Sequence, residues 1–231
     1  MAENRTPDAV VAGCRPNHSE LAALAAREQP ARLSGCDLQG LDLSRLDFSD
    51  WTFERCNLQH AQLKGAILER TSWTSCSAAF ANMTAADLTE AKFTSCDLNN
   101  AGLRGAKLTA ASFIGCKLTG ATLTETRSLD TCFRDTLLVY AKLRGMSFRG
   151  MHLEGVDFSQ ADLGDCDFRD AILAGVSLRE TSLKGARFQG ADLRGADLGG
   201  LRLGDAAAFK GATISREQAG QLLREFGLNV R

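Results

Sequence analysis

The sequence lacks an excess of charge of either sign. It has 27 Lys and Arg against 28 Asp and Glu, a formal net charge of −1, so it has no global attraction to nucleic acid or to an anionic membrane. No apolar run is long enough to span a bilayer. Residues 1–13 have no apolar core beyond residues 9–12, unlike a secretory signal. We therefore expect a cytoplasmic protein with no direct nucleic-acid or membrane partner.

Known catalytic patterns are also missing. The three histidines, His18, His60 and His152, are scattered, and none has a carboxylate at a motif spacing. The sequence contains no phosphate-binding loop, no nucleophile elbow and no metal-binding His pair. We therefore expect a binding protein rather than an enzyme, with no cofactor and no metal.

What the sequence does have is a five-residue repeat. From Leu33 to Leu203, every fifth residue is Leu, Phe, Trp or Met, with only Ala78 and Ser128 as exceptions. The residue two positions earlier is mostly small, and the positions between are mostly polar or Gly, as in ADLRG at 191–195. A period of five fits neither an α-helix nor a flat strand.

This pattern resembles the pentapeptide-repeat family, and the resemblance covers Ala31 to about Asp205. It implies an all-β solenoid, a right-handed quadrilateral β-helix in which four units form one coil. The central Leu or Phe and the small residue two positions earlier would both point inward. Roughly nine coils are expected, stacked at the spacing of neighbouring strands.

The cysteines support a coil of twenty residues. Five of them recur at that interval: Cys36, Cys56, Cys76, Cys96 and Cys116. Such a column does not converge on a metal, and its Cβ atoms lie slightly too far apart for a relaxed disulfide. We expect small buried thiols, and we expect Cys14 and Cys132, outside the series, to be the more reactive cysteines. Two aromatic columns repeat at the same interval: Phe53, Trp73, Phe93, Phe113, Phe133, and Phe148, Phe168, Phe188.

The two ends depart from the repeat. Residues 1–30 are expected to comprise a disordered start before Cys14 and a capping helix over about 18–28, with Asn17 and Glu20 as a capping box. Residues 31–205 form the predicted β-helix. Residues 206–231 are expected to form a helix begun by a Ser215–Gln218 capping box, followed by a short strand at 228–230.

The C-terminal tail resembles those of the quinolone-resistance and mycobacterial fluoroquinolone-resistance pentapeptide-repeat proteins. In those relatives this module mediates a head-to-head dimer. The resemblance implies a homodimer here, whereas a simple cap on a monomer is the alternative. The residues that would form the dimer contact are Ile214, Leu222, Leu223, Phe226 and Leu228.

Outward positions supply two candidate partner-binding surfaces. The first is an acidic column of Asp50, Glu90, Asp130 and Asp170, interrupted by Arg70 and adjacent to a cationic column at positions 64, 104, 144 and 184. The second is an apolar patch of Leu137, Val139 and Tyr140, with Phe80 in the column of Tyr140. An exposed apolar patch is typical of a contact surface. Residues 126–132, around Ser128, are expected to distort the coil.

The resemblance implies a DNA-mimicking protein that binds DNA gyrase or topoisomerase IV and protects it from an inhibitor. The mixed charge does not add to this interpretation, and no projecting loop interrupts Leu33 to Leu203. The alternative is an interaction scaffold or secreted effector that docks through the rod, with residues 1–30 as an export or targeting segment. Fold alone does not decide between them.

Overall fold

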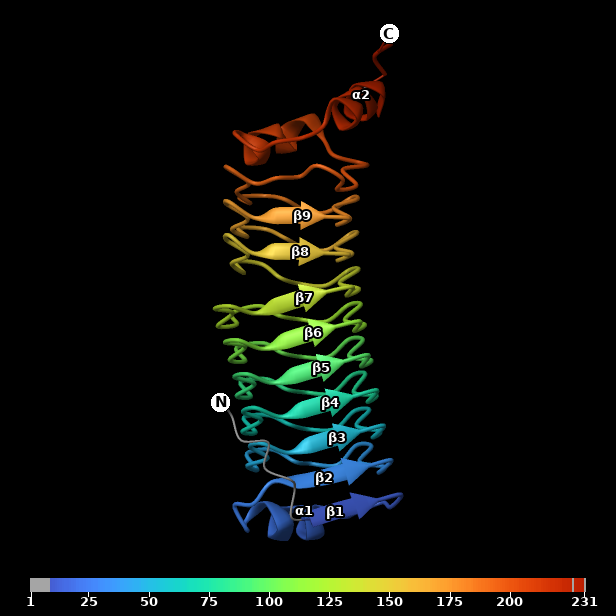
Figure 1. Ribbon diagram of the computed structural model, residues 1–231, viewed down its shortest axis with the longest axis vertical. Coiled ribbons are helices and arrows are strands. Elements are labelled where there is room, and N and C mark those ends of the chain that lie inside the picture. Colours follow the sequence, from blue (N-terminus) through green and yellow to red (C-terminus); the bar gives the residue numbers. More distant parts are fainter. Residues whose placement is uncertain (1–8, 226, 231) are drawn as a thin grey trace.

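The structure is a computed structural model that describes residues 9–225 and 227–230. Within these described residues, nine strands stack in one parallel sheet along the side of a long rod, in chain order (Figure 1). They are β1 (Ala9–Ala12), β2 (Ala31–Ser34), β3 (Thr52–Glu54), β4 (Ser72–Thr74), β5 (Lys92–Thr94), β6 (Ser112–Ile114), β7 (Cys132–Arg134), β8 (His152–Glu154) and β9 (Ile172–Ala174). From β3 onward the strands recur every twenty residues, which confirms the coil length that the cysteines indicated.

Each coil turns a corner every five residues. The last residue of each unit has positive φ, as at Gly120 (71°) and Asp50 (65°). At most corners that do not follow a strand, the next N–H bonds back across the corner, as from Ala121 to the carbonyl of Leu118 (3.0 Å), which is the arrangement of a type II turn. On the sides without strands, neighbouring coils meet through single parallel bridges. The predicted four-sided parallel solenoid is confirmed.

Two inward positions per unit form a continuous core. The five cysteines of the predicted ladder are each at most 2% exposed. The rings of Phe93 and Phe113 stack with centroids 4.9 Å apart and planes 4° from parallel. Trp73 stacks on Phe93 and donates its indole N–H to Thr71 Oγ1 (2.9 Å). Columns of like side chains fill the rod because each coil contacts only its neighbours.

The aromatic stack changes sides of the core once. One column ends at Phe133 and the other begins at Phe148, whose rings are 6.2 Å apart and tilted by 56°. In the coil before Phe148, the same inward position is held by Ser128, which is too small to stack on a ring. The core therefore lacks a matched pair of side chains at this position of the two coils.

The hydrogen-bond ladder opens at this mismatch. In a regular coil, Leu108 donates its N–H to the carbonyl of Arg127 (2.7 Å). Between these two coils, which are described throughout, the corresponding bonds from the N–H groups of residues 125, 128, 130, 147 and 152 are missing. Strands β7 and β8 pair only at Arg134 and Glu154. A fissure of about 780 Å³ results, lined by residues that include Ser128, Leu129, Asp130, Cys132, Arg149 and His152. The predicted distortion at 126–132 is confirmed.

The N-terminal cap is a helix, α1 (His18–Ala25), which begins at the predicted capping box. Asn17 Oδ1 accepts from the N–H of Glu20 (3.0 Å), and Glu20 Oε2 accepts from the N–H of Asn17 (2.9 Å). Leu21 is buried against the end of the rod. The helix ends at Ala25 rather than near residue 28, and Glu28 takes positive φ (53°).

The expectation of disorder before Cys14 is wrong for residues 9–13. Strand β1 pairs in parallel with β2, with Val11 opposite Leu33. The N–H of Gly13 then bonds to the carbonyl of Ser34 (2.9 Å). The alternating burial of β1 gives it an inward apolar face, so it adds one further coil below the repeats.

At the other end the repeat runs past the predicted boundary at residue 205. The 3₁₀ helix η1 (Leu203–Phe209) inserts one extra residue, after which Phe209 stacks on Phe188 with centroids 4.7 Å apart. The ladder continues beyond it, because the N–H of Leu193 donates to the carbonyl of Thr213 (2.9 Å). Helix α2 (Arg216–Glu225) follows the predicted Ser215–Gln218 capping box. Residues 228–230, expected to be a strand, are not one.

The stacked core predicts that Phe113→Asp unfolds the rod. The substitution leaves an unpaired carboxylate between two rings and costs more than about 4 kcal/mol. Phe113→Leu is the matched control, because Leu153 occupies the same column; it should cost about 1–2 kcal/mol. Urea unfolding followed by circular dichroism measures both. A soluble Phe113→Asp variant with wild-type stability would contradict the inward register.

The fissure predicts that Ser128→Leu stabilises the protein. Leu is the residue of this column at Leu88 and Leu108, and burying it should add about 1–2 kcal/mol. The amide groups that lack ladder bonds, at residues 128, 130 and 147, should exchange rapidly in the wild type and more slowly in the variant. Leu108→Ser is the control and should destabilise by more than about 2 kcal/mol. Slow wild-type exchange at these amides would contradict an open ladder.

Candidate functional site

The predicted acidic column lies along one corner of the rod. Asp50, Glu90, Asp130 and Asp170 all occupy the outward corner position, with φ from 57° to 65°. They belong to alternate coils, and Arg70 takes the same position between the first two. The structure therefore places the four residues on one edge, as the repeat register predicted.

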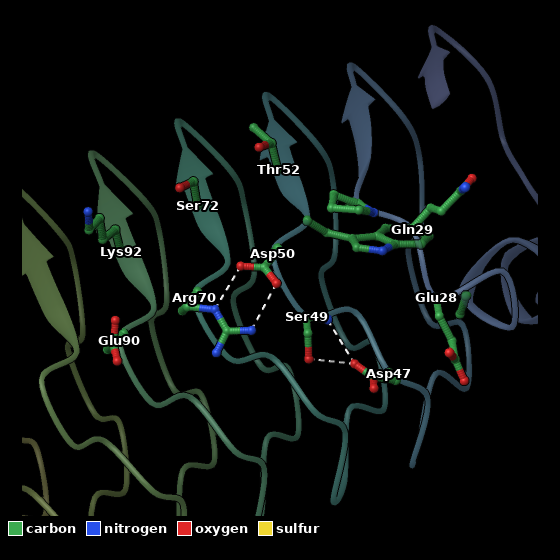
Figure 2. Close-up of a pocket in the computed structure, with 13 residues that line it drawn as sticks. Glu28, Gln29, Asp47, Ser49, Asp50, Thr52, Arg70, Ser72, Glu90 and Lys92 are labelled. Atoms are coloured by element: carbon green, nitrogen blue, oxygen red, sulfur yellow. Dashed lines mark hydrogen bonds and ion pairs between the residues drawn. The ribbon is translucent and has the colours of Figure 1, made fainter. Parts of the chain in front are cut away.

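Arginine partners neutralise half of this column. Arg70 donates from Nε and Nη2 to both carboxylate oxygens of Asp50, at 2.8 Å each (Figure 2). Its Nη1 also lies 3.2 Å from Glu69. These hydrogen bonds, first that to Asp50, raise the pKa of Arg70. Arg149 pairs with Asp170 at 3.4 Å. The column is not an uninterrupted negative stripe, and its resemblance to the phosphates of one DNA strand is weak.

A groove of about 740 Å³ lies beside the first part of this corner. Figure 2 shows Glu28, Asp47 and Glu90 around it, with the Asp50–Arg70 pair between them. Asp47 accepts from both the N–H (2.9 Å) and the hydroxyl (2.6 Å) of Ser49. The complete lining is Ala25, Glu28, Gln29, Pro30, Asp47, Ser49, Asp50, Trp51, Thr52, Arg70, Ser72, Glu90 and Lys92. Four carboxylates against two cations make this groove acidic.

Trp51 in this groove is a residue that the repeat pattern did not predict. It occupies an inward position that elsewhere holds a small residue, such as Ala91 or Ala111, yet it is only 2% exposed. Its ring contacts Phe48 edge-on, with centroids 4.9 Å apart. Its ring also lies 6.3 Å from that of Phe53 between centroids, so it packs with the aromatic rings of the core. Trp51 was visible in the sequence as the one large ring at a small-residue position.

Ion pairs between acidic and basic side chains also occur elsewhere along the rod. Asp167 accepts from Arg169 (2.7 Å) and Arg187 (3.0 Å). The hydrogen bond from Arg169 contributes most to holding the pKa of Asp167 below its usual range. On the cationic column, Arg104 pairs with Glu125 at 2.7 Å and lowers the pKa of that carboxyl. Such exposed pairs add little stability, but they leave the surface charge mixed.

The predicted apolar patch is exposed on the side of the rod. Leu137 is 39% and Tyr140 is 58% exposed, and Val139 is half-buried. Three coils earlier in the corner column of Tyr140, Phe80 is also exposed and stacks on His60, with centroids 5.1 Å apart. The patch and the aromatic column thus leave large apolar side chains exposed on the side of the rod.

The residues predicted to form the dimer contact differ in burial. Leu222 is half-buried against the core, whereas Ile214, Leu223 and Leu228 are exposed. Phe226 lies outside the described residues. Gln218 has a role that its capping-box position did not reveal, because its Nε2 donates to the carbonyls of Leu193 (2.7 Å) and Ala196 (2.8 Å) at the end of the rod.

Neither a metal centre nor a membrane helix is found in the described part of the chain. Among residues 9–225 and 227–230, no three His, Cys, Asp or Glu side chains are grouped to hold a metal ion. None of the described helices is both long and apolar enough to cross a bilayer.

Solved structures share this architecture. Full-length QnrB1, a plasmid-mediated fluoroquinolone resistance protein, matches with a TM-score of 0.60 at 17% identity, over 95% of this chain and 98% of QnrB1. HetL, a pentapeptide repeat protein involved in heterocyst differentiation regulation from the cyanobacterium Nostoc sp., matches with a TM-score of 0.50 at 25% identity, over 87% of this chain and 98% of HetL. No curated protein sequence matches this chain.

Two family models match most of the repeat. A pentapeptide repeat region matches residues 29–103, and pentapeptide repeats match residues 86–124, 131–170 and 161–200. The residues skipped inside this span, 125–130, border the fissure. The matches extend over more than half of the sequence and agree with the observed coils. The chain therefore belongs to the pentapeptide-repeat family.

Proposed function

We propose that this chain is a non-catalytic binding protein that contacts a type II topoisomerase, DNA gyrase or topoisomerase IV, and protects it from an inhibitor. The observation that carries the proposal is the shape of the rod, whose fold is similar to QnrB1 over 95% of this chain. QnrB1 is a fluoroquinolone resistance protein. In this role the protein acts in the cytoplasm and needs no cofactor.

The acidic groove is the surface we assign to the topoisomerase. A topoisomerase must present cationic side chains to hold the DNA backbone. Glu28, Asp47 and Glu90 offer carboxylates to such a surface over a short stretch of the rod. Because Arg70 neutralises Asp50 and Arg149 neutralises Asp170, the contact is local rather than a mimic of a whole DNA segment.

A homodimer through α2 completes the proposal. Ile214, Leu223 and Leu228 expose apolar surface at the C-terminal end of the rod, where a solvated cap needs only polar side chains. The half-buried Leu222 and the bonded Gln218 hold the helix against the last coil. A second copy would cover the exposed residues symmetrically.

A second candidate function is a docking scaffold for a different protein. The exposed rings of Phe80 and Tyr140 favour it, because aromatic residues are enriched in the buried centres of protein interfaces. The same fold also occurs in HetL, a protein involved in heterocyst differentiation regulation. Export as an effector would belong to this candidate, and deletion of residues 1–30 would then abolish its interaction.

Topoisomerase protection is tested by gyrase supercoiling in the presence of a cleavage-stabilising fluoroquinolone. Adding the wild-type protein at micromolar concentration should restore supercoiling and reduce cleaved DNA. Glu90→Lys places a cation in the groove and should raise the half-protective concentration by about tenfold, the equivalent of about 1.4 kcal/mol. Glu180→Lys is the matched control at another corner of positive φ and should protect like the wild type.

The outcomes separate the two candidate functions. Equal loss of protection in both variants would remove the groove as the contact but keep the topoisomerase as partner. Absence of protection by the wild-type protein, with inhibitors of different chemistry, would contradict the first proposal and leave the docking scaffold as the better one.

The proposed dimer predicts that Leu223→Glu produces a monomer. The charge would be placed in the apolar contact, where it has no partner. Light scattering after size exclusion should give about twice 24.8 kDa for the wild type and 24.8 kDa for the variant. Gln221→Glu adds the same charge to an exposed position of the same helix and should remain dimeric. A wild-type monomer at all concentrations would identify α2 as a cap only.

A further inference from the structure

Two thiols lie in contact at the N-terminal end of the cysteine ladder. The Sγ atoms of Cys14 and Cys36 are 3.7 Å apart. The β1–β2 register pairs residues that differ by 22, as Ala12 with Ser34, and this offset also sets Cys14 opposite Cys36. The N–H of Asp37 bonds to the carbonyl of Cys14 (2.9 Å) and holds that alignment. Cys14, expected to lie outside the ladder, is its first member.

The two sulfurs differ in access. Cys14 is exposed, whereas Cys36 is only 1% exposed. Burial raises the pKa of the Cys36 thiol to about 11, so it is a poor target for an oxidant in solution. A reagent therefore meets Cys14 first, with Cys36 directly behind it. The expectation that stacked cysteines lie slightly too far apart for a relaxed disulfide does not hold for this pair, because its Sγ atoms are already in contact. The spacing of neighbouring strand backbones also lies within the range of Cα distances that a disulfide accepts.

We propose that Cys14 and Cys36 form a reversible disulfide when the protein meets a peroxide. The Cys14 sulfur attacks one oxygen of the peroxide and the O–O bond breaks. The other oxygen departs as water with the thiol proton, and Cys14 becomes a sulfenic acid. Cys36 sulfur then attacks Cys14 sulfur, the S–O bond breaks, and the oxygen leaves as a second water with the Cys36 proton. Two thiols are oxidised and one peroxide is reduced to two waters. A small thiol reverses the bond by exchange.

The disulfide fastens the N-terminal coil to the repeats. Without the disulfide, two kinds of contact hold β1 and α1 on the rod. β1 pairs with β2 through backbone hydrogen bonds, and side chains such as Leu21 of α1 are buried in the core. Ala25, at the end of α1, and Glu28 line the acidic groove. Closing the loop between Cys14 and Cys36 therefore rigidifies one wall of that groove. This inference concerns the redox state of the cap and does not depend on the topoisomerase as partner.

The test treats the full-length protein with hydrogen peroxide, alkylates the remaining thiols and measures mass. Two of the eight cysteines should escape alkylation, with loss of two hydrogen atoms and one cross-linked peptide pair that contains Cys14 and Cys36. Amide exchange in residues 9–13 should slow by about tenfold. Dithiothreitol should restore all eight thiols.

Three variants decide the assignment. Cys14→Ser should abolish the cross-link, and Cys36→Ala should leave a sulfenic acid on Cys14 that dimedone traps. Ala is already present at the equivalent inward position at Ala196, so Cys36→Ala should fold. Cys132→Ser, at the other partly exposed thiol, should cross-link like the wild type. Cys14 oxidised to sulfinic acid beside an alkylated Cys36, or joined to a second copy, would overturn the proposal.

Discussion

Each inward side chain of this rod must stack on its counterpart in the next coil, which within the repeats is the residue twenty positions away, and the rest of the structure depends on that match. The constraint arises because each coil contacts only its neighbours. Where the match holds, as for Phe93 and Phe113, rings stack and the backbone ladder is continuous. Where Ser128 precedes Phe148 it fails, and the coils separate. A core of stacked columns thus makes local stability depend on pairs of residues rather than on single ones.

The same constraint confines function to outward positions. Corner residues project farthest, but their positive φ strains any residue other than glycine. A bulky ring there, as at Phe80 (60°) and Tyr140 (57°), is unfavourable in both conformation and solvation, since more than half of each side chain is exposed. Contact with a partner would offset this cost, which is the physical argument for proposing that Phe80 and Tyr140 belong to a second contact surface.

The sequence was sufficient for the fold because the period of five and the cysteine interval of twenty are both visible in one chain. Prediction from the sequence failed where the chain departs from the period of five. β1 pairs across 22 residues because a helix replaces two corners, and Phe209 is displaced by the one extra residue in η1, although AAFKG at 207–211 still shows the shifted repeat. The repeat also placed Arg70 beside Asp50 but not their bidentate contact, which depends on side-chain conformation.

The two proposed contacts, the acidic groove and the dimer contact through α2, lie at opposite ends of the rod, and this placement allows both to act together. The acidic groove lies next to α1, whereas α2 lies at the far end of the rod (Figure 1). A head-to-head dimer through α2 would therefore hold two identical grooves at the outer ends of a doubled rod. Each groove alone offers a short, partly neutralised charge surface, so its affinity would be modest. A partner that is itself two-fold symmetric could bind both grooves at once, and the second contact, being intramolecular, would strengthen the complex without any further charge.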